Sequence, residues 1–110
     1  MIKNKTRNNI IAHHSLLADT FYRRLKGLLG TTALPHGEGF IIKPCSSVHT
    51  FGMKYSIDVL FVDKNHKIIK KNENMRPGQV SMAFGSSYVI ELPAGTIGQT
   101  ECMIGDEIKL

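Results

Sequence analysis

Residues 44–63, PCSSVHTFGMKYSIDVLFVD, contain the pattern from which the centre of the fold can be predicted. Its second half carries apolar side chains in both alternating sets of positions, with Ile57, Val59 and Phe61 in one set and Leu60 and Val62 in the other. Successive side chains of a β-strand point to opposite faces of its sheet. We therefore expect a strand over residues 57–62 that is buried on both of its faces.

Asp58 stands in the middle of this apolar run. A carboxylate in such a place is costly unless it is hydrogen-bonded or paired, and losing the partner of a buried pair costs roughly 3–5 kcal/mol. Two interpretations are open. Asp58 either accepts hydrogen bonds from backbone N–H groups of a neighbouring loop, as a structural residue, or it forms part of a ligand pocket with Arg24 or His49 as its partner.

Short β-rich segments flank the central strand in both directions. We expect strands over residues 2–5, 10–17, 39–43, 47–53, 67–71, 80–84, 88–92 and 107–110. Residues 63–66 have the composition of a hairpin turn. The strand that returns after it is flanked by lysines, which is typical of a strand near the edge of a sheet. Residues 72–79 contain Pro and Gly and are expected to form an irregular loop, and residues 94–96 a turn.

Residues 20–30, TFYRRLKGLLG, have the periodicity of a helix. Apolar side chains recur at i, i+4, i+7 and i+8, and Gly30 lies where a helix favours a left-handed residue. Arg24 lies near the edge of the apolar stripe, from which it can reach inward to a carboxylate. The sequence thus predicts a mainly β (α+β) fold, a compact antiparallel β-barrel-like sheet with one short helix near residues 20–29.

The chain of 110 residues has the length of one domain, residues 1–110. Its 14 basic and 9 acidic residues give a formal net charge of +5, which makes nucleic acid or an acidic surface a candidate partner. An ordinary solvated basic surface is the simpler explanation. The aromatic residues are not interleaved with the basic clusters, as a platform for single strands requires, so nucleic acid is not the favoured partner.

The sequence shows no sign of membrane insertion or export. It has no apolar run of about 18 residues, and residues 1–14, MIKNKTRNNIIAHH, do not have the pattern of a signal peptide. We therefore expect a cytoplasmic protein without a membrane span. In that compartment Cys45 and Cys102 are expected to be free thiols rather than a disulfide.

Cys45 and His49 are weak catalytic candidates. A thiol beside an imidazole is the arrangement of a hydrolase or transferase that uses a cysteine nucleophile. Four residues along an extended strand separate two side chains by roughly 13 Å, so these two meet only if residues 46–47 form a turn. A small buried cysteine is the alternative interpretation. Whether the chain is an enzyme stays open.

Glu91 interrupts the apolar strand YVIELP, residues 88–93. Alternation places it on the same face as Val89, where it either faces water or joins Arg24 or Lys54 in an ion pair. The spacing gives no specific support to a carboxylate pair of Glu91 with Asp58, as in a glycosidase.

The sequence lacks the common metal and cofactor motifs. It contains no CxxC and no HExxH, its histidines are scattered, and it has no glycine-rich phosphate loop. We therefore predict neither a metal nor a cofactor.

Six segments together resemble the domain of unknown function 192 family of small prokaryotic domains. They are residues 24–30 (RLKGLLG), 37–42 (GEGFII), 44–53 (PCSSVHTFGM), 57–63 (IDVLFVD), 91–95 (ELPAG) and 105–106 (GD). The resemblance covers the chain from about Ile2 to Leu110. It departs at residues 54–57, KYSI, where many relatives have a proline before the Ile-Asp pair. It implies a compact, mainly antiparallel β fold with one short helix, and no established biochemical function.

The family motifs direct attention to six positions: Arg24, Cys45, His49, Met53, Asp58 and Glu91. We expect an uncharacterised small binding or accessory module for a small ligand or a partner protein. Its expected ligand-binding residues are Arg24, His49, Asp58 and Glu91. The alternatives are an enzyme that uses Cys45 and His49, and weak nucleic-acid association through the basic surface.

Overall fold

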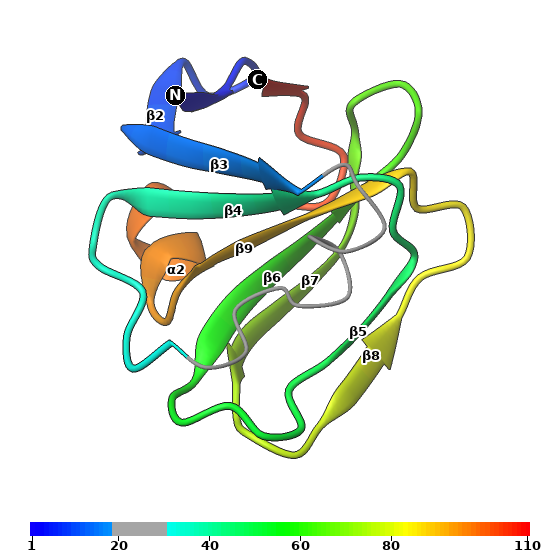
Figure 1. Ribbon diagram of the computed structural model, residues 1–110. Coiled ribbons are helices and arrows are strands. Elements are labelled where there is room, and N and C mark those ends of the chain that lie inside the picture. The colour runs from blue at the N-terminus through cyan, green and yellow to red at the C-terminus, as the bar shows by residue number, and fades with distance from the viewer. Residues whose placement is uncertain (19–30) are drawn as a thin grey trace.

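The computed structural model describes residues 1–18 and 31–110. The helix expected near residues 20–29 lies outside these ranges, and Arg24 with it. Strands dominate the described residues, and α2 (Thr96–Thr100) is a short helix among them (Figure 1). The predicted mainly β class is thus confirmed.

A five-stranded sheet forms the centre of the molecule, with the strand order β3-β4-β9-β6-β7 (Figure 1). These strands span His14–Ala18, Glu38–Ile42, Tyr88–Pro93, Ile57–Val62 and Ile68–Met75. Neighbouring strands are antiparallel, except that β3 and β4 are parallel. Every residue of β6 is buried, which confirms the predicted strand that is covered on both faces.

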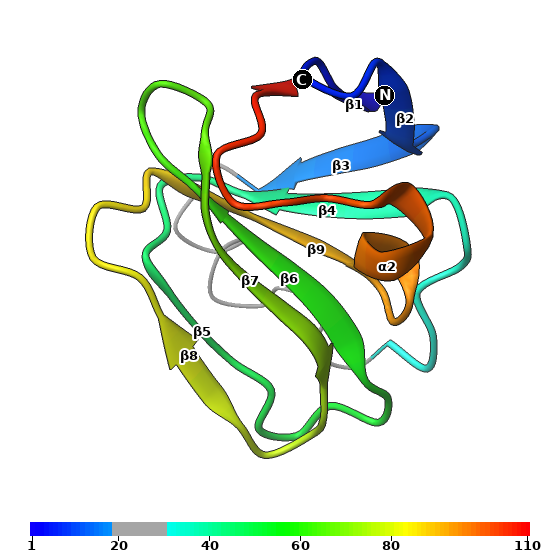
Figure 2. The ribbon, with the colours of Figure 1, turned by 180° about the vertical axis from the view of Figure 1, so that it is seen from behind.

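Two smaller sheets accompany the central one. The first has the order β10-β1-β2, built from Ile108–Lys109, Ile2–Asn4 and Asn9–Ala12. The second is a two-stranded antiparallel ribbon of β5 and β8, Ser47–His49 and Val80–Met82. Figure 2 shows α2 in front of the end of β9, whereas Figure 1 shows it behind the sheet.

The apolar core has two parts, one on each face of the five-stranded sheet. Leu60 and Val62 of β6 belong to the part that also takes residues from β1, β2, β10 and α2. Val59 and Phe61 belong to the part beneath the β5–β8 ribbon. This division confirms the predicted alternation of β6. Each side chain of an inner strand therefore packs into one of these two parts of the core.

The predicted turn joins β6 to β7. The Oδ1 of Asp63 accepts hydrogen bonds from the N–H groups of Asn65 and Lys67, each at 2.9 Å, and His66 has a φ of +63°. β7 lies at one edge of the sheet, as the flanking lysines predicted.

Several details differ from the expectations. The described strands form open sheets, so the barrel-like description is loose. β7 continues to Met75, opposite Ile57, because β6 offers pairing along its whole length; residues 72–75 are therefore strand and not loop. The segment expected as one strand over residues 10–17 is divided at His13, because β2 and β3 pair in different sheets. The turn expected at residues 94–96 leads into α2.

Candidate functional site

Asp58 is fully buried on the face of the sheet that packs against α2. Its Oδ1 accepts a hydrogen bond from the N–H of Asn74 at 2.8 Å. Its Oδ2 accepts hydrogen bonds from the N–H groups of Gly95 at 3.1 Å and Ile97 at 2.8 Å. Three backbone donors thus replace the water that the carboxylate loses on burial. This geometry fits the structural interpretation of Asp58.

The same contacts cap helix α2. The first turn of a helix has backbone N–H groups with no partner inside the helix. The N-cap residue Gly95 has a φ of +96° and no side chain to accept from them. Asp58 supplies the acceptor from β6. Asp58 therefore joins the start of α2 to the centre of the sheet.

Glu91 is a second buried carboxyl group of the sheet, with 5 % of its surface exposed. It shares the face of Val89, which packs beneath the β5–β8 ribbon, and so points away from Asp58. Its cross-strand neighbours are Phe40 on β4 and Val59 on β6. The interpretation in which Glu91 faces water is therefore wrong. A carboxylate pair with Asp58 does not form, because the sheet lies between the two groups.

The Glu91 carboxyl lies in an apolar setting without a described counter-charge. No residue in the ranges 1–18 and 31–110 donates a hydrogen bond or forms an ion pair with it. Burial raises the pKa of this carboxyl from 4.5 to about 7, because loss of water disfavours the charged form. Lys54 is exposed and does not pair with it. Arg24 lies outside the described residues, so its pairing with Glu91 stays a prediction.

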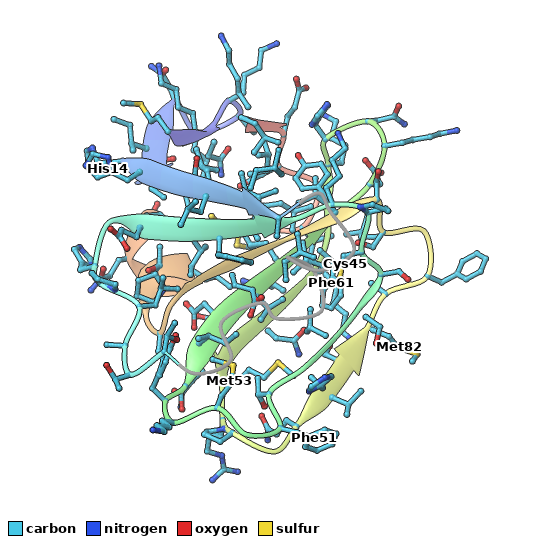
Figure 3. All side chains as sticks on the ribbon, in the orientation of Figure 1. His14, Cys45, Phe51, Met53, Phe61 and Met82 are labelled. Atoms are coloured by element: carbon cyan, nitrogen blue, oxygen red, sulfur yellow. The ribbon has the colours of Figure 1, made fainter. Side chains whose placement is uncertain are left out.

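Partly buried side chains border this region of the core. They are Leu34, Phe40, Cys45, Met53, Tyr55 and Ile69. Figure 3 labels Cys45 and Met53 together with Phe61, a buried residue of the same cluster. The hydroxyl groups of Tyr55 and Thr31 share a hydrogen bond of 2.6 Å. We call Glu91, together with its neighbours Phe40, Val59 and Val89, the Glu91 face.

Cys45 precedes β5, and His49 is the last residue of that strand. The Cys45 thiol donates a hydrogen bond to the carbonyl oxygen of Ser47 at 3.2 Å, and the side chain packs against the core beneath the ribbon. The His49 imidazole is exposed and stacks on Phe51, with 5.2 Å between the ring centroids. The thiol thus faces the core while the imidazole lies on the outer surface of the ribbon.

Part of the basic character near the chain ends is neutralised within the chain. Lys5 and Lys67 pair with Glu107 at 3.4 and 3.2 Å, and the Nε of Arg7 pairs with Asp106 at 2.7 Å. Burial opposes ionisation of Asp106, but hydrogen bonds from Asn4, Met103 and Arg7 outweigh it and lower the pKa of this carboxyl.

The profile of a known family, DUF192 (Uncharacterized ACR), matches residues 2–110. The chain belongs to the DUF192 family. A UPF0127 protein of Thermococcus sibiricus is 34 % identical over 113 residues, covering 98 % of this chain and 73 % of the relative. A UPF0127 protein of Pyrococcus horikoshii is 30 % identical over 115 residues, covering 99 % of this chain and 97 % of the relative.

A solved structure of a protein of unknown function from Novosphingobium aromaticivorans resembles this DUF192 domain with a TM-score of 0.79. The two are 24 % identical, and the match covers 87 % of this chain and 74 % of the other. This likeness shows a shared fold. The family assignment confirms the resemblance found in the sequence motifs.

Within residues 1–18 and 31–110 no helix is long and apolar enough to cross a membrane. No group of three or more His, Cys, Asp or Glu side chains in the same ranges is arranged to hold a metal ion.

Proposed function

We propose that this DUF192 domain is a binding module for a small ligand whose positively charged nitrogen meets the Glu91 carboxylate. The proposal is based on the surroundings of Glu91. Glu91 has a nearly buried carboxyl group to which no residue of the described ranges donates a hydrogen bond. Buried ionisable groups are normally paired or hydrogen-bonded. A ligand with a cationic N–H group supplies the positive charge and the hydrogen-bond donor that those residues do not provide.

The neighbours of Glu91 indicate the rest of the ligand's chemistry. Phe40 and Val59 flank the carboxyl group along the sheet, and Met53 and Tyr55 border the same part of the core. Sites for small molecules are mostly apolar, with a few polar groups that fix orientation. An amine or guanidinium group on an apolar or aromatic body therefore fits better than an anion or a sugar.

The proposal retains Glu91 from the four ligand-binding residues expected from the sequence. Asp58 faces the other side of the sheet and already accepts three hydrogen bonds. His49 lies on the outer surface of the ribbon. Arg24 defines the competing arrangement, in which an ion pair with Glu91 from within the chain takes the place of the ligand.

Binding of a cation at Glu91 is coupled to release of a proton. With its pKa raised to about 7, the carboxyl group is mainly protonated at about pH 6, whereas a cation binds the ionised form. The affinity for a cation should therefore increase as the pH rises from about 5 to about 7.

Calorimetry tests the proposal with a panel of aromatic amines and guanidines, beginning with benzylamine and phenylguanidine, at about pH 6. Benzyl alcohol is the neutral comparison. We expect binding of the cations with release of up to about one proton, measured from the heats in two buffers of different ionisation enthalpy. Glu91→Gln should abolish both the binding and the proton release. Glu38→Gln, which removes an exposed carboxylate at the start of β4, is the matched control.

Two results would contradict this function. One is that no member of the panel binds the wild-type domain. The other is that Glu91→Gln binds the cations as tightly as the wild type, with the same proton release.

A further inference from the structure

The β5–β8 ribbon carries apolar side chains on its outer surface. The two strands are antiparallel, with His49 opposite Val80 and Ser47 opposite Met82. These four side chains alternate with residues that are buried against the core. Val80 and Met82 are 56 % and 63 % exposed, although both are large and apolar. The outer surface of the ribbon is therefore a place where apolar groups face water without cover.

A Phe-Gly turn extends this surface at each end of the ribbon. The N–H of Met53 donates to the Thr50 carbonyl oxygen and the N–H of Ser86 donates to that of Ala83, each at 3.2 Å. The glycines inside the two turns, residues 52 and 85, have φ of +78° and +91°. In both turns the residue before the glycine is a phenylalanine: Phe51 and Phe84.

These turns direct both aromatic rings outward. Phe51 is 53 % exposed and Phe84 is completely exposed. Figure 3 shows Phe51 and Met82 projecting away from the body of the molecule. We call Phe51, Val80, Met82 and Phe84 the apolar ridge. Large exposed apolar groups gathered on one surface mark a site of interaction with a protein or a membrane.

The two segments that build the apolar ridge carry charged side chains of one sign. The segments that build it, residues 43–57 and 76–90, contain no Asp and no Glu. They do contain the cations Lys43, Lys54 and Arg76. In addition, the Nζ of Lys70 donates a hydrogen bond to the carbonyl oxygen of Met82 at 2.9 Å. The apolar ridge thus combines exposed apolar side chains with nearby cations. A binding partner that fits it has both apolar groups and negative charges.

The surface of an anionic bilayer has these two properties. Exposed aromatic and aliphatic side chains enter the boundary between headgroups and acyl chains, while nearby Lys and Arg side chains interact with the lipid phosphates. Phenylalanines at the corners of turns suit such insertion because they protrude. A second copy of this chain is a poor occupant, since two ridges face to face would bring their cations together.

We propose that the apolar ridge docks this domain onto the surface of a negatively charged lipid bilayer. Phe51 and Phe84 enter the interface, and Lys54 and Arg76 contact lipid phosphates. The site is separate from the Glu91 face, which lies on the inner side of the ribbon. Failure of either proposal therefore leaves the other standing.

Co-sedimentation of the full chain with lipid vesicles tests this proposal. Vesicles of phosphatidylcholine with phosphatidylglycerol are compared with vesicles of phosphatidylcholine alone at low salt. We expect binding to the anionic vesicles only. The double variant Phe51→Ser/Phe84→Ser and the double variant Lys54→Glu/Arg76→Glu should each bind them at least about tenfold more weakly. Ile104→Ser is the matched control, because it removes an apolar side chain that is exposed elsewhere on the surface.

Several outcomes would overturn the proposal. Wild-type protein that stays in solution with both kinds of vesicle would remove it. Equal binding of Phe51→Ser/Phe84→Ser and wild type would show that charge alone causes the attraction. Equal binding of wild type to both kinds of vesicle would contradict the role of the cations. Binding to soluble polyglutamate, without binding to vesicles, would assign the ridge to an acidic protein instead. Circular dichroism checks that each variant is folded.

Discussion

Asp58 and Glu91 lie on neighbouring strands of one sheet and point to its opposite faces. Both carboxyl groups are buried, but their surroundings differ. Asp58 accepts three hydrogen bonds from backbone N–H groups, whereas Glu91 receives none from the described residues. The Asp58 carboxylate stabilises the fold, because it joins the start of α2 to the sheet. The Glu91 carboxylate is unfavourable when ionised, and it is the group on which the proposed function depends.

Glu91→Gln should stabilise the domain in a pH-dependent way. The raised pKa of about 7 means that the folded state holds a proton which the unfolded state loses above about pH 4.5. Wild-type stability therefore falls as the pH rises from about 4.5 to about 7, by about 3 kcal/mol at most, and then levels off. The free energy of unfolding of the variant minus that of wild type should rise over this range. Urea unfolding at about pH 4 and about pH 8 measures it, and a pH-independent difference would refute the prediction.

Asp58→Asn should destabilise the domain by about 2–3 kcal/mol, because the amide has a single acceptor oxygen and turns N–H donors toward backbone N–H groups. The amide protons of Asn74, Gly95 and Ile97 should also exchange faster with solvent, since they lose their charged acceptor. Urea unfolding and hydrogen exchange measure the two effects, with Glu38→Gln as the control. A loss below about 0.5 kcal/mol would mean that Asp58 is not a structural residue.

Gly39→Ala should cost about 1–3 kcal/mol by overpacking the core. A Cβ atom at this position of β4 would lie 2.8 Å from the Cδ1 of Ile2 and 3.2 Å from the Cβ of Ala12. Gly98→Ala, in helix α2, is the comparison, because its Cβ would meet only the Oε1 of Glu73 at 3.5 Å and alanine favours helix. Gly39→Ala should therefore lower the melting temperature, whereas Gly98→Ala should not. Thermal unfolding measures both. The opposite order would show that β4 is packed differently.

Cys102 should be protected from thiol reagents in the folded protein. Its side chain is 1 % exposed, and burial raises the pKa of its thiol, so the reactive thiolate is both scarce and covered. In the variant Cys45→Ser, Ellman's reagent should modify Cys102 at least about 100-fold more slowly in buffer than in denaturant. Similar rates in the two conditions would contradict the burial of this residue.

The strand pattern was predictable where the local signal is strong. Residues 57–62 are apolar at both alternating positions, which specifies a strand with both faces covered, and this is what β6 is. The turn at residues 63–66 was predictable for the same kind of reason, because its residues hydrogen-bond within the turn itself. Local chemistry of this kind can be seen in the sequence.

Features that depend on distant partners could not be predicted in the same way. The cap of α2 comes from Asp58, 39 residues before Ile97, so the sequence around the helix gives no sign of where it starts. The break at His13 depends on the pairing of β3 with β4. The separation of Asp58 from Glu91 requires the register between β6 and β9, which no local pattern specifies. For this reason the sequence identified the residues of the candidate site, but it could not show which of them lie on the same face of the sheet.

Titration of the Glu91 carboxyl carbon by ¹³C NMR would show whether this group is buried without a counter-charge. Comparison of wild type with Glu91→Gln assigns the signal. We predict a pKa of about 7, because the carboxyl group is buried without a counter-charge from the described residues. A pKa at or below 4.5 would contradict this prediction. In that case a cation of the chain itself, with Arg24 as the first residue to replace, already fills the place that we assign to the ligand.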